Sequence, residues 1–342
     1  MVASNAPDAD VLAGFRGEYF ALAFRRGITH GLPAMAVLPF LVAGGVLAWD
    51  RWVRRRRDPD APPAIPREVL LLSFLGILVH TPMDWLNVYG ARWWLPFDGT
   101  WSYGDALFIV DPWLWLLLGS AVFLARAGSR VLWAFLALGV AALMLFGPVP
   151  RTAGILWLAG LAAVAAVRRW GGLEDEARRR LAARAAVSAS AAYVALMVLA
   201  AGLGERRVMA AADDAGLESF DAMVSPTAAN PFAAEVEVVT AGGYVPGELR
   251  WLPRPRVTLR PEDVVPFLRR PSDMPEDALA SVLAAAEGMP EVRDYLTWSR
   301  YPHVQVRSEG GAWEVRWSDA RYDDGAGAGG LSGVRVRVPG AR

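Results

Sequence analysis

Long apolar stretches before residue 205 constrain the fold of this 342-residue chain more than any other feature. A helix needs roughly 20 apolar residues to cross a hydrocarbon layer of about 30 Å. The stretches that meet this requirement are 31–49, 68–88, 106–125, 131–148 and 186–204. A sixth, 152–167, is shorter, but arginines bound it and we count it as a span. The sequence predicts a mainly α-helical, polytopic transmembrane bundle of five or six spans.

Composition supports a membrane protein and excludes several kinds of site. Hydrophobic residues make up 54% of the chain, and most of the 15 tryptophans lie near the ends of apolar runs, as in the aromatic belt of a membrane interface. The formal net charge of +0 gives no reason to expect a nucleic-acid partner. The absence of cysteine excludes disulfides and thiolate metal sites. The first residues, MVASNAPDADV, lack the pattern of a signal peptide, so insertion must rely on the internal spans.

Arginine is concentrated in alternate connections between the predicted spans, and short positively charged loops stay on the cytoplasmic side. The arginine-rich connections contain Arg51, Arg54, Arg55, Arg56, Arg57, Arg67, Arg126, Arg130, Arg168, Arg169, Arg178, Arg179, Arg180 and Arg184. The other connections contain only Arg92 and Arg151. This alternation requires 152–167 to cross, and it predicts an extracytoplasmic C-terminus. Five arginines oppose this orientation but are outnumbered: Arg16, Arg25, Arg26, Arg206 and Arg207.

From about residue 225 the pattern changes to short alternating runs separated by Gly and Pro, which predict half-buried strands. The runs are 234–239, 312–317 and 334–338. Between them, 275–289 opens with Pro and two acidic residues before apolar residues at helical spacing, which predicts a short helix. We therefore divide the chain into a transmembrane helical domain, 1–205, and a soluble, β-rich α+β domain, 206–342.

The predicted span 68–88 carries polar residues on one face. His80, Asp84 and Asn87 follow one another at i, i+4 and i+7 and would share a face of a continuous helix. Ionisable groups at membrane depth are costly, and they usually face a bundle interior or a wet cavity where they mark function. The structural alternative is an interhelical hydrogen-bonding pair without a metal.

Two N-terminal motifs add further metal-ligating side chains on the same predicted side of the membrane. His30 ends FRRGITHG at the mouth of the first span, and PDAD contains Asp8 and Asp10. Taken alone, PDAD reads as a turn and His30 as a residue at a helix start. Together with His80 and Asp84, they form the set of imidazoles and carboxylates expected for zinc or a similar divalent ion.

These motifs resemble those of a known family. PDAD, RRGITH and HTPMDWLNVYGARWWLPF, in this order, are similar to the PDxD, HRGxTH and HxxxD pattern of the bacterial inner-membrane metal-dependent hydrolases of the YdjM type. The resemblance covers about residues 6–115. It implies a helical membrane-embedded hydrolase fold, similar to zinc-dependent phospholipase C. By position it implies the metal ligands Asp8, Asp10, His30, His80 and Asp84, with Arg26, Gly27 and Thr29 at supporting positions.

The chain departs from the family pattern at two places. Arg25 stands where the family motif begins with His, so one candidate ligand is replaced by a cation. The early Thr-His element that the family carries on a first helix has no counterpart. We expect either that the chain begins downstream of the family start or that its site is incomplete.

Three other polar residues are weaker candidates. Asp105 and Asp111 belong to the Trp-rich stretch 89–115 and are candidates to line the site. Asp105 is alternatively an acid at a helix start, and Asp111 is costly within an apolar run unless it is paired. We expect His303 to be a surface or packing histidine.

The leading hypothesis is a metal-dependent hydrolase at the outer face of the bacterial inner membrane, with zinc the first choice of metal. Asp84, Asp10 and Arg26 are the expected catalytic residues, and a carboxylate outside the metal shell could act as general base. Arg25 and Arg26 suit an anionic phosphoester, small or lipid-linked. The alternative is a non-catalytic membrane scaffold or partner-binding protein with a structural His–Asp network. A transporter is disfavoured because the polar residues lie at one end of the bundle.

Overall fold

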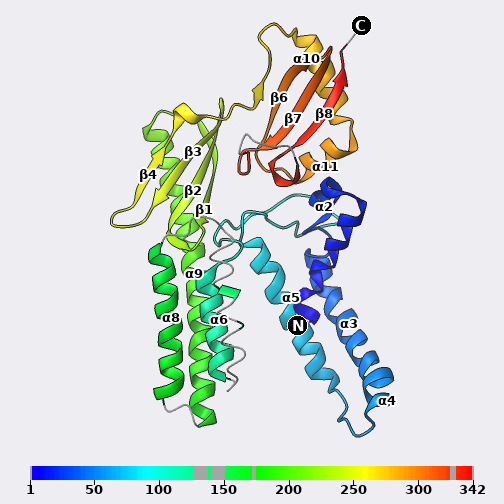
Figure 1. The fold of residues 1–342 in the computed structure, drawn as a ribbon, viewed down its shortest axis with the longest axis vertical. Coiled ribbons are helices and arrows are strands. Elements are labelled where there is room, and N and C mark those ends of the chain that lie inside the picture. The colour runs from blue at the N-terminus through cyan, green and yellow to red at the C-terminus, as the bar shows by residue number, and fades with distance from the viewer. Residues whose placement is uncertain are drawn as a thin grey trace.

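The computed structural model describes residues 2–125, 134, 138–139, 151–171, 175–323 and 329–340. Two groups of helices extend in the same direction from a layer that contains two small β-sheets (Figure 1). The N-terminal group consists of α1 (Val2–Asn5), α2 (Glu18–Phe24), α3 (Leu32–Trp49) and α5 (Pro66–Trp85), with the 3-10 segment η1 (Pro7–Arg16) between α1 and α2. The second group consists of α6 (Pro112–Ala125), α8 (Arg151–Trp170) and α9 (Glu176–Asp214).

Four of the described helices are long and apolar enough to cross a membrane. They are Leu32–Arg57, which is α3 with its continuation η2 (Asp50–Arg54) and α4 (Arg55–Arg57), then α5, Thr152–Trp170 and α9. Only 11% to 17% of the most apolar window in each helix is buried inside the protein. Such extensive apolar surface is unusual for a protein surrounded by water on all sides, and it suits contact with lipid.

The helices differ from the predicted spans at several ends. Helix α6 begins at Pro112 rather than at 106, because the Asp111 carboxylate accepts hydrogen bonds from the backbone nitrogens of Trp113 and Leu114 and so caps the helix start. The predicted span 186–204 is the middle of the 39-residue helix α9. The predicted span 131–148 lies almost entirely outside the described residues.

The first sheet is antiparallel and packs against the end of α9. Its strands β1 (Ser219–Thr227), β2 (Asn230–Thr240), β3 (Gly243–Arg250) and β4 (Arg256–Leu259) are in sequence order. Alternate residues of β2 turn to the helix, where Val236 and Val238 join Val208 and Ala212 in a buried core. The predicted boundary at 205/206 therefore falls inside a continuous helix that ends against the sheet.

The second sheet has the order β5 (Leu268–Arg269), β6 (Pro302–Glu309), β7 (Ala312–Asp319) and β8 (Val334–Pro339). It forms a core with α10 (Glu276–Glu287) and α11 (Pro290–Trp298), around side chains such as Val292, Tyr295 and Val315. The predicted strands lie within β2, β7 and β8, and the predicted helix is α10.

The second sheet and its helices contact the N-terminal helices directly. Tyr19 on α2 donates a hydrogen bond to the carbonyl oxygen of Gly333, and the Trp101 indole nitrogen donates to that of Thr297. Arg321 donates to the carbonyl oxygen of Val88 at 2.7 Å. The C-terminal region, residues 219–340, thus lies over the end of α5 where the polar motifs are found (Figure 1).

Candidate metal centre

The end of α5 places two of the predicted ligands one helical turn apart. His80 and Asp84 lie on the same face in its last two turns. The helix stops at Trp85 because another segment satisfies its terminal carbonyls: the Gly104 nitrogen donates to Trp85, and the nitrogens of Ala106 and Leu107 donate to Leu86. Asn87, which the sequence placed on the same helical face, therefore lies beyond the helix.

The loop between α2 and α3 is held around Asp10. Arg26 has a φ of 53°, in the left-handed region that non-glycine residues rarely adopt. Its backbone nitrogen donates to Asp10 Oδ2 at 2.8 Å, and the Thr29 hydroxyl donates to the same oxygen at 3.2 Å. These bonds offset a backbone strain of about 1–3 kcal/mol. The result is a loop that presents the fully buried His30 to α5.

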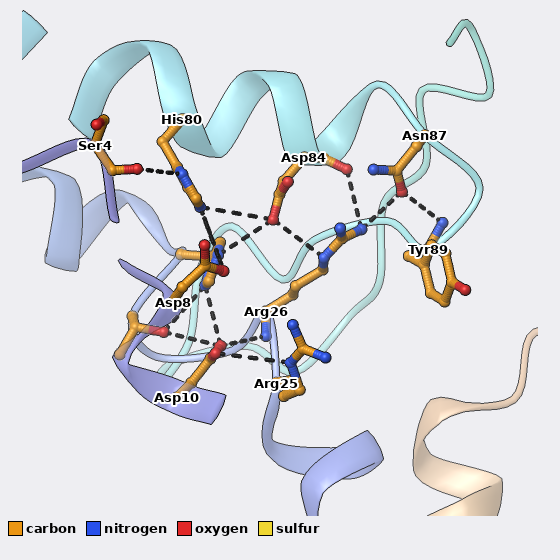
Figure 2. Close-up of polar contacts among 11 residues, drawn as sticks. Ser4, Asp8, Asp10, Arg25, Arg26, His80, Asp84, Asn87 and Tyr89 are labelled. Atoms are coloured by element: carbon orange, nitrogen blue, oxygen red, sulfur yellow. Dashed lines mark hydrogen bonds and ion pairs between the residues drawn. The ribbon is translucent and has the colours of Figure 1, made fainter. Parts of the chain in front are cut away.

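Four of the five predicted ligands, Asp8, His30, His80 and Asp84, converge at this point. Figure 2 labels Asp8, His80 and Asp84 among them. The Nε2 atoms of His30 and His80 are 3.3 Å apart, and Asp84 Oδ2 lies 3.3 Å from the first and 3.7 Å from the second. Asp8 Oδ1 lies 3.8 Å from His30 Nε2 and 3.7 Å from His80 Nε2. Tetrahedral zinc with bonds of about 2.0–2.1 Å separates its ligand atoms by about 3.3–3.4 Å. The four atoms lie within 4.8 Å of one another, so the cluster could hold a metal ion.

The outer nitrogens of both imidazoles face hydrogen-bond acceptors. His80 Nδ1 lies 2.8 Å from the carbonyl oxygen of Ser4, and His30 Nδ1 lies 3.2 Å from Asp10 Oδ2. The Thr29 hydroxyl also lies 3.0 Å from His30 Nδ1. With a proton on each Nδ1, the tautomer that these acceptors favour, each Nε2 presents a lone pair to the cluster. This arrangement is the one that orients metal-ligating histidines. The residues present therefore fit a divalent cation.

Arg26 closes one side of the cluster. Its Nε lies 3.1 Å from Asp84 Oδ2, and its Nη1 donates to the backbone oxygen of Asp84 and to Asn87 Oδ1. Asn87 also accepts from the backbone nitrogen of Tyr89, which forms the turn after the helix. Asn87 is thus part of the site as a support for Arg26 rather than as a helical neighbour of Asp84.

Asp10 and His30, which lie outside the apolar helices, have shifted pKa values. Burial alone would raise the pKa of Asp10, but hydrogen bonds from His30 and the Arg26 backbone hold it below its ordinary value, so this carboxylate is ionised at neutral pH. Burial alone would lower the pKa of His30, but its hydrogen bonds with Asp10 and Asp84 raise it. The carboxylates therefore favour positive charge at this position, whether from a proton or from a metal ion.

Other predicted site residues lie elsewhere. Asp105 forms an ion pair with Arg300 at 2.7 Å, and Asp111 caps α6 and accepts from the Tyr193 hydroxyl. Neither contacts the His–Asp cluster, so these structural roles replace the expectation that the two residues line it. His303 is buried and pairs with Asp323 at 3.1 Å. The sequence also contained the signal for the helix start, since Asp111 followed by Pro112 is a capping pattern.

Among the residues that the structure describes, Ser4 is the one participant without a sequence signal. It acts through its backbone carbonyl oxygen, which any residue type would provide. The tight packing of α1 on α5 brings it there, because a Cβ added at Gly76 would lie 3.0 Å from the Ser4 nitrogen and 3.1 Å from Ala3 Cβ. Glycine at a close helix contact is a recognisable pattern, but its partner segment cannot be inferred from it.

The comparison with known families confirms the resemblance that the motifs indicated. Residues 1–154 match a family model described as YdjM inner membrane protein. No curated protein and no solved structure matches the chain.

Proposed function

We propose that this chain is a metal-dependent membrane hydrolase that acts on phosphoesters. The proposal takes as its premise the match of residues 1–154 to the model of the YdjM inner membrane protein family. The observation that carries the proposal is the convergence of two imidazole lone pairs and two carboxylates, with both Nδ1 atoms facing acceptors. Asp8, His30, His80 and Asp84 would hold the ion.

Electrostatics favour a metal over a purely structural network. Two Nε2 lone pairs at 3.3 Å repel each other unless a cation or a proton lies between them. Two carboxylate oxygens at less than 4 Å from both add further negative charge. A purely structural network would need a proton on one of these Nε2 atoms to alternate donors and acceptors. A scaffold function with a structural His–Asp network is therefore the second candidate.

A divalent ion bound here would supply a Lewis acid and lower the pKa of water enough to form a nucleophile near neutral pH. The chain's own residues would do the rest. Arg26 and Arg25 would bind and orient the anionic oxygens of a phosphoester. Asp8, whose side chain is 42% exposed, is the ligand best placed to accept a proton. Asp10 would fix the orientation of His30, which makes it a positioning residue.

The arrangement of the helices supports placing this centre at the outer surface of the membrane. The arginine-rich helix α4, the end of α8 with Arg168 and Arg169, and the start of α9 all lie at the end away from the sheets (Figure 1). Positive charge at that end favours a cytoplasmic position for it. The C-terminal region and the His–Asp cluster would then be extracytoplasmic, and membrane lipids or lipid-linked phosphoesters would have access.

Elemental analysis of the purified full-length protein tests the metal. We expect about one equivalent of zinc or another divalent ion, lost in His80→Ala/Asp84→Ala and kept in the matched control His303→Gln. Wild-type protein prepared without chelator and free of stoichiometric metal would rule out the hydrolase. Hydrolysis of bis(p-nitrophenyl) phosphate, lost in the same double variant, would support the hydrolase over a scaffold.

A reporter fused to the C-terminus tests the topology separately. A cytoplasmic signal from this reporter would overturn the proposed orientation.

A further inference from the structure

A cavity of about 310 Å³ lies beside the His–Asp cluster, between the N-terminal helices and the C-terminal region. Arg25 and Arg26 line it together with Leu22 of α2 and Ile109. Three aromatic side chains, Tyr89, Trp101 and Trp298, and Leu331 complete the lining. The cavity therefore combines guanidinium groups with flat apolar surfaces.

We infer that this cavity is the substrate pocket of the proposed metal centre, and that the C-terminal region forms part of its wall. The substrate class that fits is a phosphoester attached to a planar ring. This inference rests on the proposed function for its chemistry, but its binding component can be measured without turnover.

Arg26 connects the cavity to the metal ligands. The same side chain lines the cavity and contacts Asp84 Oδ2 at 3.1 Å. Arg25 leaves 48% of its side chain exposed, and its Nε lies 3.8 Å from Asp10. An anion bound by these two guanidinium groups would therefore be adjacent to the ligand cluster, where a phosphoester must lie to be hydrolysed.

The aromatic wall is held in place by its own contacts. Trp298 stacks on Tyr322 with a centroid separation of 5.7 Å, and Tyr322 stacks on Tyr89 at 6.0 Å. The Trp101 indole nitrogen donates to the Thr297 carbonyl oxygen at 2.7 Å, which fixes this ring beside α11. Rings fixed in this way lose little freedom when a flat ligand group stacks on them.

Two of the lining residues, Trp298 and Leu331, come from the C-terminal region. A hydrogen bond from Tyr19 to the Gly333 carbonyl oxygen crosses the junction, and within the C-terminal region Tyr295 donates to the Leu331 carbonyl oxygen. A role in selecting the substrate would explain why this region is docked against the mouth of the metal site.

Equilibrium binding of phenyl phosphate and methyl phosphate to the full-length, zinc-loaded protein tests the inference. We expect phenyl phosphate to bind about two- to tenfold more tightly, because only it can stack on the rings. Trp101→Leu should remove this preference, whereas Trp313→Leu should keep it, since Trp313 packs against the same core without lining the cavity. Arg25→Gln should weaken both ligands equally.

A second variant covers the case in which Trp101→Leu does not fold. Leu331→Trp adds volume inside the cavity and should weaken phenyl phosphate more than methyl phosphate. Equal binding of the two phosphates by the wild type, or an unchanged preference in a folded Trp101→Leu protein, would overturn the inference. If either result is found while the wild type still hydrolyses bis(p-nitrophenyl) phosphate, the inference fails but the proposed function stands. If the wild type prefers phenyl phosphate but is purified without metal and hydrolyses no phosphoester, the substrate pocket is supported and the proposed hydrolase is not.

Discussion

The Nδ1 atom of His80 lies 2.8 Å from the carbonyl oxygen of Ser4, 76 residues earlier in the chain. This contact makes the N-terminal segment part of the candidate metal centre through its backbone. The close packing of α1 on α5 at Gly76 brings this carbonyl to the histidine.

Gly76→Leu is expected to weaken metal binding without changing any ligand. The new side chain would push Ala3 and Ser4 away from α5 and remove the acceptor of His80, and loss of such partners typically costs 10- to 100-fold in metal affinity. Competition with a chelator of known affinity measures the change. Gly44→Leu in α3 is the matched control because nothing lies within 4 Å of a Cβ there. Ser4→Ala should be neutral.

Asp10→Asn is expected to lower metal affinity by a similar factor. The amide cannot provide the charge that orients His30, and the Arg26 and Thr29 bonds to this side chain would weaken. The same chelator competition measures it, with Asp98→Asn in an exposed loop as the control. Unchanged affinity would show that Asp10 has no positioning role.

Glu237 should make the first sheet less stable as the pH rises. Burial and the nearby charge of Asp319 raise the pKa of this glutamate to about 8, against 4.5 ordinarily. Between these values the folded protein keeps a proton that the unfolded chain releases, so the free energy of unfolding falls with increasing pH. The loss is on the order of a few kcal/mol by pH 8.

Thermal unfolding of the wild type and of Glu237→Gln between pH 5 and pH 8.5 measures this dependence. The variant should gain stability relative to the wild type as the pH increases, because its amide never ionises. A difference between the two proteins that is independent of pH would contradict the assignment.

Arg300→Met should destabilise the junction between the C-terminal region and the N-terminal helices. Arg300 and Asp105 are largely buried and 2.7 Å apart, so removal of the arginine leaves a buried carboxylate without its partner, at a cost of about 3–5 kcal/mol. Adding Asp105→Leu should restore part of the loss. Hydrogen exchange at residues 298–302 measures the effect, and an additive double variant would argue against coupling.

The candidate site could be predicted from sequence to the extent that its groups are side chains at regular spacing. His80 and Asp84 are one turn apart on an apolar helix, and this pattern is visible in any membrane sequence. The grouping with Asp8 and His30 depended on family motifs and on the loop-charge argument. The carbonyl of Ser4 has no sequence signal because all residues have one.

The ends of elements were harder to predict than their existence, for physical reasons. Helix α5 stops at Trp85 because 104–107 supplies its terminal hydrogen bonds, a tertiary contact that local hydropathy does not contain. The apolar run from 106 continues into α6, but its first residues form this contact instead of helix. In the C-terminal region, the strands with clear alternation were predicted, whereas β5 has two residues and is defined by its partner.

Helix α9 passes from the apolar group to the first sheet without interruption over 39 residues. Each residue inserted along it would raise the sheet by about 1.5 Å and turn it by about 100° around the helix axis. The orientation of the C-terminal region around the axis of α9 is therefore set by the number of residues in this helix. Insertions that a flexible linker would absorb would here rotate the C-terminal region off the mouth of the metal centre.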